Sequence, residues 1–229
     1  MLRLFVESDL VAGASLEASA EHAHYLGVVM RRGVGEPLCL FNGRDGEWSG
    51  RVEALHRGKG RFLVDALRRP QADEGTLTLM FALLKRDTTD LVVQKATELG
   101  ASDLRPVITE RTNAARTNEA RLRAIAIEAA EQSERLTVPV IHAPVPLAEA
   151  LGAWPVDRPL FCAMERADVA PPRPVTGPAG LLIGPEGGFG PRDHALLERA
   201  AFVRAVRLGP RILRAETAAI VGLALLQAA

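Results

Sequence analysis

Hydrophobic and polar positions follow two different rhythms along the chain. Over residues 1–70, short apolar runs are separated by turn signals, such as Asn42-Gly43 and Asp45-Gly46 within PLCLFNGRDGEWSGRVEAL. Such pairs between apolar runs are typical of β-hairpins. This part of the chain is therefore predicted to form a small β-barrel.

A polar stretch separates this region from the next. The segment RRPQADEGT (residues 68–76) has no large apolar side chain and contains Pro70 and Gly75. Proline and glycine interrupt regular structure, so the segment is predicted to be a linker. We accordingly expect two domains, residues 1–70 and residues 71–229.

After the linker, strand-like and helix-like segments alternate. Residues 77–84 (LTLMFALL) are all apolar except one threonine, as expected for a strand buried on both faces. Residues 88–100 carry apolar side chains at helical spacing and end at Gly100, a typical C-terminal cap. Further strands are predicted at 104–109, 158–164, 181–184 and 203–209, and further helices at 120–136, 191–201 and 216–229. The alternation predicts an α/β domain whose parallel sheet carries helices on both faces.

Composition excludes several classes of protein. The 229 residues have a formal net charge of zero, so nothing attracts the whole chain to nucleic acid or to an acidic membrane. Its two cysteines, Cys39 and Cys162, lie in apolar runs and cannot form a disulfide scaffold. Neither a signal peptide nor a membrane-spanning run is evident. We therefore expect a soluble cytoplasmic protein.

Metal binding is not expected. His22 and His24 would share one face of a strand, but no third candidate ligand is near them in the sequence.

Two loops near the end of the chain are the candidate site. LLIGPEGGFG (residues 181–190) and RLGPRILRAETAA (residues 207–219) each lead out of an apolar strand. Two such strands can lie side by side in a parallel sheet, and their loops would then share one crevice at the carboxyl ends of the strands. Glycines let backbone N–H groups approach a ligand closely, and Arg211, Arg214 and Glu216 add charge.

Two other interpretations of the glycine-rich turn stay open at this point. A phosphate cradle in a nucleotide-binding enzyme fits poorly, because the spacing is not G-x-G-x-x-G and no G-K-[ST] follows. A tight turn without a ligand is the other interpretation. The second loop weakens it, because the small residues Ala218, Ala219 and Gly222 allow the following helix to pack very closely.

The two loops resemble the C-terminal signature of the SPOUT class of S-adenosylmethionine-dependent RNA methyltransferases. More narrowly, they are similar to the RsmE family, which methylates N3 of a uridine in small-subunit (16S) ribosomal RNA. The resemblance continues through AHYLGVVMRRGVGEPLCLFNG (residues 23–43), LLKRDTTDLVVQKATELGASDLRPVITERT (residues 83–112) and EAAEQSERLTVPVI (residues 128–141).

This resemblance implies a fold and a cofactor. It implies a PUA-like RNA-binding barrel, followed by a SPOUT domain with a deep trefoil knot, which chain-threading rules alone would not suggest. S-adenosylmethionine would lie bent in the knot, and a homodimer would complete the active site. The cofactor-binding residues implied are Met164, Ile183, Gly184, Pro185, Glu186, Gly187, Gly188, Leu208, Gly209, Ile212, Leu213, Arg214, Thr217 and Ala218.

Methylation of uracil N3 requires that its hydrogen be removed, or that cations stabilise the anion spread over the flanking carbonyls. Glu186 and Glu216 are the candidate bases, and Arg211 and Arg214 the candidate cations. A carboxylate at a helix N-terminus, such as that of Glu216, can instead have the single role of interacting favourably with the helix dipole. An RNA-binding module that kept the fold without catalysis is the remaining alternative.

RNA binding requires local basic charge. From residue 51 to residue 69, six bases (Arg51, Arg57, Lys59, Arg61, Arg68, Arg69) face only two acids. This run is either a phosphate-binding surface or a solvated face. The family motifs further predict RNA contacts by Arg31, Arg32, Lys85, Arg111 and Arg135.

Overall fold

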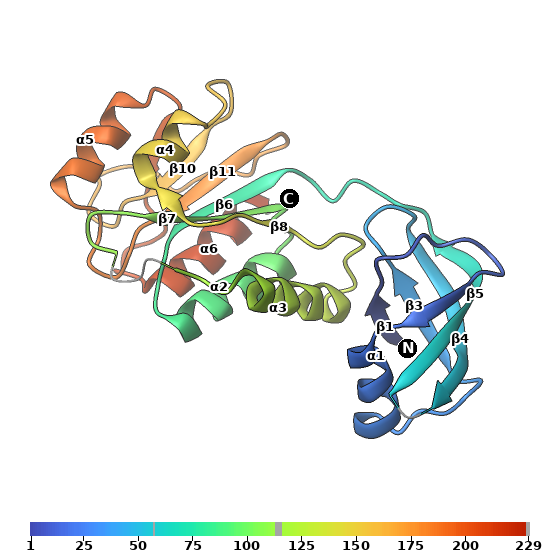
Figure 1. Ribbon diagram of the computed structural model, residues 1–229. Helices are drawn as coiled ribbons and strands as arrows, with labels where there is room; N and C mark the ends of the chain where they lie inside the picture. The colour runs from blue at the N-terminus through green and yellow to red at the C-terminus, as the bar shows by residue number, and fades with distance from the viewer. Residues whose placement is uncertain (57, 113–115, 228–229) are drawn as a thin grey trace. The chain divides into compact units, whose positions relative to one another are not determined.

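The computed structural model describes residues 1–56, 58–112 and 116–227. The chain divides into two compact units, which are coloured along the sequence in Figure 1. The first unit comprises Met1–Glu74 and Ala130–Val138, and the second comprises Gly75–Ala129 and Pro139–Ala229.

The first unit is built on a five-stranded mixed sheet in the order β1-β3-β4-β5-β2. Its strands are β1 (Leu2–Phe5), β2 (Ser15–Ala18), β3 (Pro37–Phe41), β4 (Glu47–His56) and β5 (Lys59–Arg69). The predicted hairpin at residues 42–46 is confirmed, because β3 and β4 pair antiparallel on either side of it. Gly43 and Gly46 both have a positive φ there, as this turn requires. Leu38, Leu40 and Phe62 are buried in the core of the unit.

One segment of this unit is helical where the sequence suggested strands. Helix α1 (Ala20–His24) continues into a π-helical turn, η1 (Tyr25–Val29). The Ser19 hydroxyl accepts a hydrogen bond from the backbone N–H of His22 at 3.0 Å and so caps the helix. The expectation that His22 and His24 lie on a strand is therefore wrong, because a capping serine and two alanines favour a helix here.

Residues 130–138 pack into the first unit, although the sequence assigns them to the predicted domain 71–229. The buried Arg3 guanidinium donates to the carbonyl oxygens of Ala130 (2.8 Å) and Arg135 (2.7 Å). The Glu74 carboxylate accepts from the backbone N–H of Leu136 at 2.7 Å. Two ionic side chains thus attach this segment, and neither contact follows from a local hydrophobic pattern.

The second unit holds a seven-stranded sheet in which every pairing is parallel, as predicted. The order is β12-β10-β11-β6-β7-β8, and β9 also pairs with β7. Its strands are β6 (Leu77–Ala82), β7 (Asp103–Ile108), β8 (Val140–Ile141), β9 (Val145–Pro146), β10 (Leu160–Ala163), β11 (Ala179–Ile183) and β12 (Val203–Val206).

Helices cover both faces of this sheet, which confirms the prediction (Figure 1). They are α2 (Arg86–Glu98), α3 (Glu119–Gln132), α4 (Leu147–Gly152), α5 (Pro191–Arg199) and α6 (Ala215–Gln227). On one face, Leu147 of α4 and Leu197 of α5 share a buried cluster with Leu182 of β11. On the other face, α6 packs against β11, β6 and α2. Within the described residues, no helix is long and apolar enough to cross a membrane.

Helix α6 approaches the sheet closely, as its small residues allow. A Cβ atom at Gly222 would lie 2.6 Å from Cδ2 of Leu181, which is fully buried in β11. Any larger residue at this contact would require the buried Leu181 side chain to shift. The trefoil knot implied by the family resemblance concerns the path of this segment through the loops around it, and it stays a prediction.

Candidate active site

A cavity of about 550 Å³ lies at the carboxyl edge of the second sheet. The segments that follow β6, β10, β11 and β12 all contribute to its wall. Open parallel sheets bind ligands at this edge. The two glycine-bearing loops therefore share one crevice, as predicted from the sequence.

The two strands that feed these loops are not neighbours, which corrects one expectation. β10 lies between them and pairs with both β11 and β12. The connection through α5 carries the chain past β10, so the loops meet above the end of that strand. Ala163, Met164 and Glu165, at or directly after the end of β10, line the cavity between them.

Most of the predicted cofactor residues line this cavity, namely Met164, Ile183, Gly184, Pro185, Glu186, Gly188, Leu208, Gly209, Ile212, Leu213, Arg214 and Ala218. Gly187 and Thr217 do not line it. The cofactor prediction omitted Lys85, Thr88, Glu165 and Phe189. Lys85 and Thr88 follow β6, and the rule that parallel strands end at one edge could have found them.

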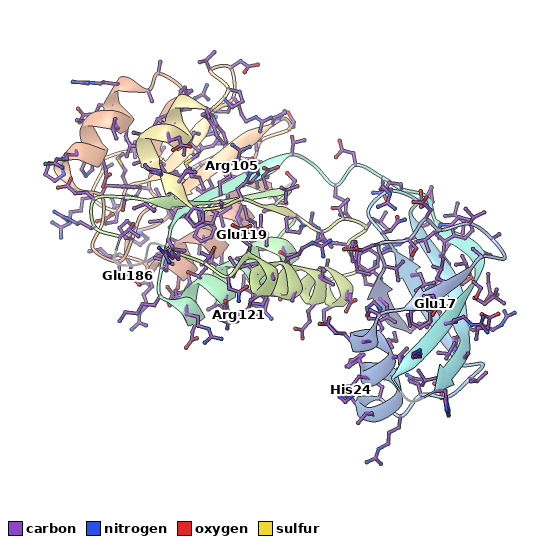
Figure 2. All side chains as sticks on the ribbon, in the orientation of Figure 1. Glu17, His24, Arg105, Glu119, Arg121 and Glu186 are labelled. Carbon is purple, nitrogen blue, oxygen red and sulfur yellow. The ribbon has the colours of Figure 1, made fainter. Side chains whose placement is uncertain are left out.

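The four candidate catalytic side chains, Glu186, Arg211, Arg214 and Glu216, all line the cavity. Figure 2 labels Glu186. Glu216 is partly buried and the other three are exposed. Among the described residues, none of these four side chains forms a hydrogen bond or an ion pair. Two positive and two negative groups are thus available to a ligand.

The glycine-rich loop is tightly folded around Phe189. A Cβ at Gly184 would lie 3.0 Å from the Phe189 ring, which is buried beneath the loop. Gly188 has a φ of 69° and donates its N–H to the carbonyl of Pro185 at 2.8 Å. A left-handed backbone at this position favours glycine. These glycines therefore shape the wall of the cavity.

A buried carboxylate joins this loop to the end of β7. Asp193, 4% exposed, accepts from the backbone N–H of Gly190 at 2.9 Å and from that of Glu110 at 3.1 Å. Glu110 in turn accepts from the backbone N–H of Arg192 at 3.0 Å, which supplies the N-terminal cap that Gly190 lacks. A side chain on Gly190 would overlap the Glu110 carboxylate.

The predicted RNA contacts fall into two groups. Arg31 is exposed and has a φ of 51°, and Arg32 pairs with Glu36. Lys85 lines the cavity, and Arg111 donates a hydrogen bond of 2.6 Å to the carbonyl of Gly187. These four stay predicted RNA contacts. Arg135 differs, because its side chain is only 6% exposed and pairs with Glu74 at 3.3 Å. A phosphate has no access to that buried guanidinium.

The basic run from residue 51 to residue 69 is paired only in part within its own unit. Arg51 pairs with Asp65, Arg61 lies 3.5 Å from Glu53, and Arg69 lies 3.0 Å from Glu47, which Arg3 also contacts at 2.7 Å. Arg57 lies outside the described residues. These acids do not balance the bases of the run, so the solvated face and the phosphate-binding surface both stay predictions.

Cys162 supplies no nucleophile. It is fully buried in β10, and this burial raises the pKa of its thiol. A neutral, inaccessible thiol does not react.

Comparison with known proteins agrees with this arrangement. Residues 71–227 match the family model of the RNA methyltransferase domain, and residues 19–65 match that of the RNA methyltransferase PUA domain. The ribosomal RNA small subunit methyltransferase E of Rickettsia conorii is 33% identical over 234 residues, which cover 97% of this chain and 93% of that protein. Its counterpart from Synechocystis is 30% identical and covers 99% of this chain and 77% of that protein.

Two solved structures share the fold and were determined with S-adenosylmethionine bound. A putative methyltransferase from Legionella pneumophila superimposes with a TM-score of 0.90 at 30% identity, covering 99% of this chain and 97% of that one. The ribosomal RNA small subunit methyltransferase E of Neisseria gonorrhoeae gives a TM-score of 0.86 at 29% identity, covering 98% and 95%.

The PUA domain, the parallel-sheet domain and the cavity at its carboxyl edge place this chain in the SPOUT class of RNA methyltransferases. Within that class, the chain belongs to the ribosomal RNA small subunit methyltransferase E family, known as RsmE.

Proposed function

We propose that this protein transfers a methyl group from S-adenosylmethionine to N3 of a uridine in 16S ribosomal RNA. The observation that carries the proposal is the cavity at the carboxyl edge of the second sheet, where a glycine-rich wall meets four charged side chains that have no partner among the described residues. The cytoplasmic location expected from the sequence suits this substrate and is part of the same proposal.

The residues around the cavity fit the cofactor. A volume of about 550 Å³ accommodates a ligand of this size, and the wall combines backbone groups of Gly184 and Gly188 with the apolar side chains of Ile183, Leu208 and Leu213. Gly184 has no Cβ, which leaves room for the Phe189 ring packed beneath this wall. When bound, the cofactor supplies an electrophilic methyl group on sulfur.

The protein must then align the uracil and remove its proton. Alignment of N3 with the methyl group is mainly a matter of proximity and orientation. Glu186 or Glu216 would accept the proton from N3. Arg211 or Arg214 would stabilise the negative charge that develops on the neighbouring carbonyl oxygens. Both carboxylates line the same cavity, so the assignment of the base between them stays open.

A second copy of the chain would complete the site. Ile212 lines the cavity and is nevertheless 69% exposed. The proposed homodimer would cover this loop and enclose the cavity.

Methyl transfer by the purified protein tests the proposal. Incubation with labelled S-adenosylmethionine and unmodified 16S rRNA should yield 3-methyluridine as the labelled nucleoside. Arg214→Ala should lower kcat by about 10²- to 10³-fold, as the loss of one charge-stabilising donor does. Because Arg214 is exposed and its side chain has no partner within the described part of the chain, its replacement should leave the unfolding transition unchanged.

Full activity of Arg214→Ala would exclude this side chain from the mechanism and leave Arg211 as the cation. A second result would contradict the proposal itself. Binding of RNA without any methyl transfer by the wild-type protein would support a non-catalytic RNA-binding module instead.

A further inference from the structure

A second cavity, of about 430 Å³, adjoins the first one. Met164, Glu165, Gly188 and Phe189 line both cavities, so the two share a wall. The remaining lining residues belong to the second cavity alone: Arg111, Arg166, Ala167, Gly187 and His194. A ligand in the second cavity would therefore lie directly beside the proposed cofactor site.

The second cavity combines basic side chains with an apolar wall. Arg111 is held in place by its hydrogen bond of 2.6 Å to the carbonyl of Gly187. Arg166 is exposed and, within the described part of the chain, forms no hydrogen bond or ion pair. A guanidinium group offers a planar set of donors that matches phosphate oxygens. Two arginines and a histidine here face one carboxylate, that of Glu165.

The apolar wall suits a base or a ribose. Phe189 is buried, and its ring packs edge-on against the exposed imidazole of His194, with the centroids 6.2 Å apart. Met164 extends the same wall into the first cavity. Single-stranded nucleic acid is recognised by basic groups along its backbone and by flat side chains against its bases. Of the two rings here, the exposed imidazole of His194 can serve as such a flat side chain, and Phe189 supports it from beneath.

We propose that the second cavity binds one nucleotide of the substrate RNA strand, with its phosphate against Arg111 and Arg166. This inference rests on the proposed function and specifies how its substrate is held. Sugar and base lie toward His194 and toward Met164 and Phe189, two of the four residues that line both cavities. The strand is thereby held next to the cofactor cavity through its backbone, without any demand on the base sequence.

Equilibrium binding as a function of salt tests this assignment without relying on catalysis. The probe is a fluorescent single-stranded RNA that carries the target uridine and its flanking sequence, added to the full-length protein with saturating S-adenosylmethionine. Arg166→Gln should raise the Kd for this RNA about tenfold, the usual effect of losing one charged hydrogen bond. The slope of log Kd against log salt should fall by about 0.7, the value for one lost phosphate contact in single strands.

Arg173→Gln is the matched control. Arg173 is exposed in the same connection between β10 and β11, and it lines neither cavity. The Kd of this variant for RNA should equal that of the wild type, apart from the small increase expected when any surface arginine is replaced. Neither variant should change the Kd for S-adenosylmethionine measured without RNA.

Three results would overturn the assignment. One is equal RNA affinity of Arg166→Gln and Arg173→Gln, and another is weaker binding by Arg166→Gln with an unchanged salt slope. The third is a parallel loss of S-adenosylmethionine affinity, which would make the second cavity part of the cofactor site. Failure of the proposed function appears differently, as a wild-type protein that binds the RNA but does not methylate it.

Discussion

At the scale of single residues, the charged side chains separate into two kinds. Arg3, Glu47, Glu74 and Arg135 are largely buried and pair with one another or with backbone groups of the first unit. Those around the cavity of the second unit, such as Arg214 and Glu216, have no partner among the described residues. Charges of the first kind stabilise the fold, whereas charges of the second kind are available for chemistry.

Glu74 makes the first kind testable through pH. Burial alone would raise the pKa of Glu74, but hydrogen bonds from Leu136 and Thr137 and the charge of Arg135 outweigh it, so the pKa lies below its usual value. In the unfolded chain the pKa of this carboxyl is about 4.3, and in the folded protein it is lower. The ionised Glu74 therefore stabilises the folded protein above the unfolded-state pKa, and this stabilisation is lost as the pH falls through the folded-state pKa.

Glu74→Gln should therefore lower the free energy of unfolding by about 1–3 kcal/mol at pH 7, as expected when a charged hydrogen-bonded group is lost. The difference from wild type should shrink as the pH falls below about 4. Urea denaturation at several pH values measures it. Glu17→Gln is the control, because Glu17 is exposed (Figure 2) and should show little effect at any pH. A deficit for Glu74→Gln that stays constant with pH would refute the role given to its charge.

At the scale of elements, the close packing of α6 on β11 depends on one glycine. Gly222→Ala should destabilise the protein by about 1–3 kcal/mol, because the added methyl group has no room beside the buried Leu181. Gly152→Ala is the matched control in another helix. A Cβ there meets nothing within 4 Å, so it should leave stability unchanged or raise it by up to about 1 kcal/mol. Thermal unfolding compares the two variants, and equal effects would contradict the packing argument.

The sequence predicted the long, strongly periodic elements well and the short ones poorly. β6, α2 and α5 follow from their apolar spacing and from caps such as Gly100, whose φ is 78°. The sequence did not indicate β8, β9 or α4, because two-residue strands and a six-residue helix have too few positions for a period to appear. Helix α1 was missed for the same reason.

At the scale of the whole molecule, the candidate site was more predictable than the arrangement of the chain around it. Both loops are local in sequence, and the rule for the carboxyl edge of a parallel sheet brings them together. The position of β10 between their strands depends on strand order, which no local pattern encodes. The burial of Arg135 likewise depends on a contact with Glu74, 61 positions away in the sequence.

The zero net charge of the chain hides local differences between the two units. Ion pairs compensate part of the basic run in the first unit, whereas Arg166, Arg211 and Arg214 at the two adjoining cavities have no side-chain partner among the described residues. Attraction to RNA is therefore expected to be local rather than spread over the protein.

The central claim is that this chain methylates N3 of a uridine in 16S rRNA. Mass mapping of 16S rRNA from a strain that lacks the gene tests it most directly. One uridine should lose its methyl group in that strain, regain it when the wild-type gene is restored, and stay unmethylated with Arg214→Ala. An rRNA whose methylated uridines are unchanged by loss of the gene would contradict the account.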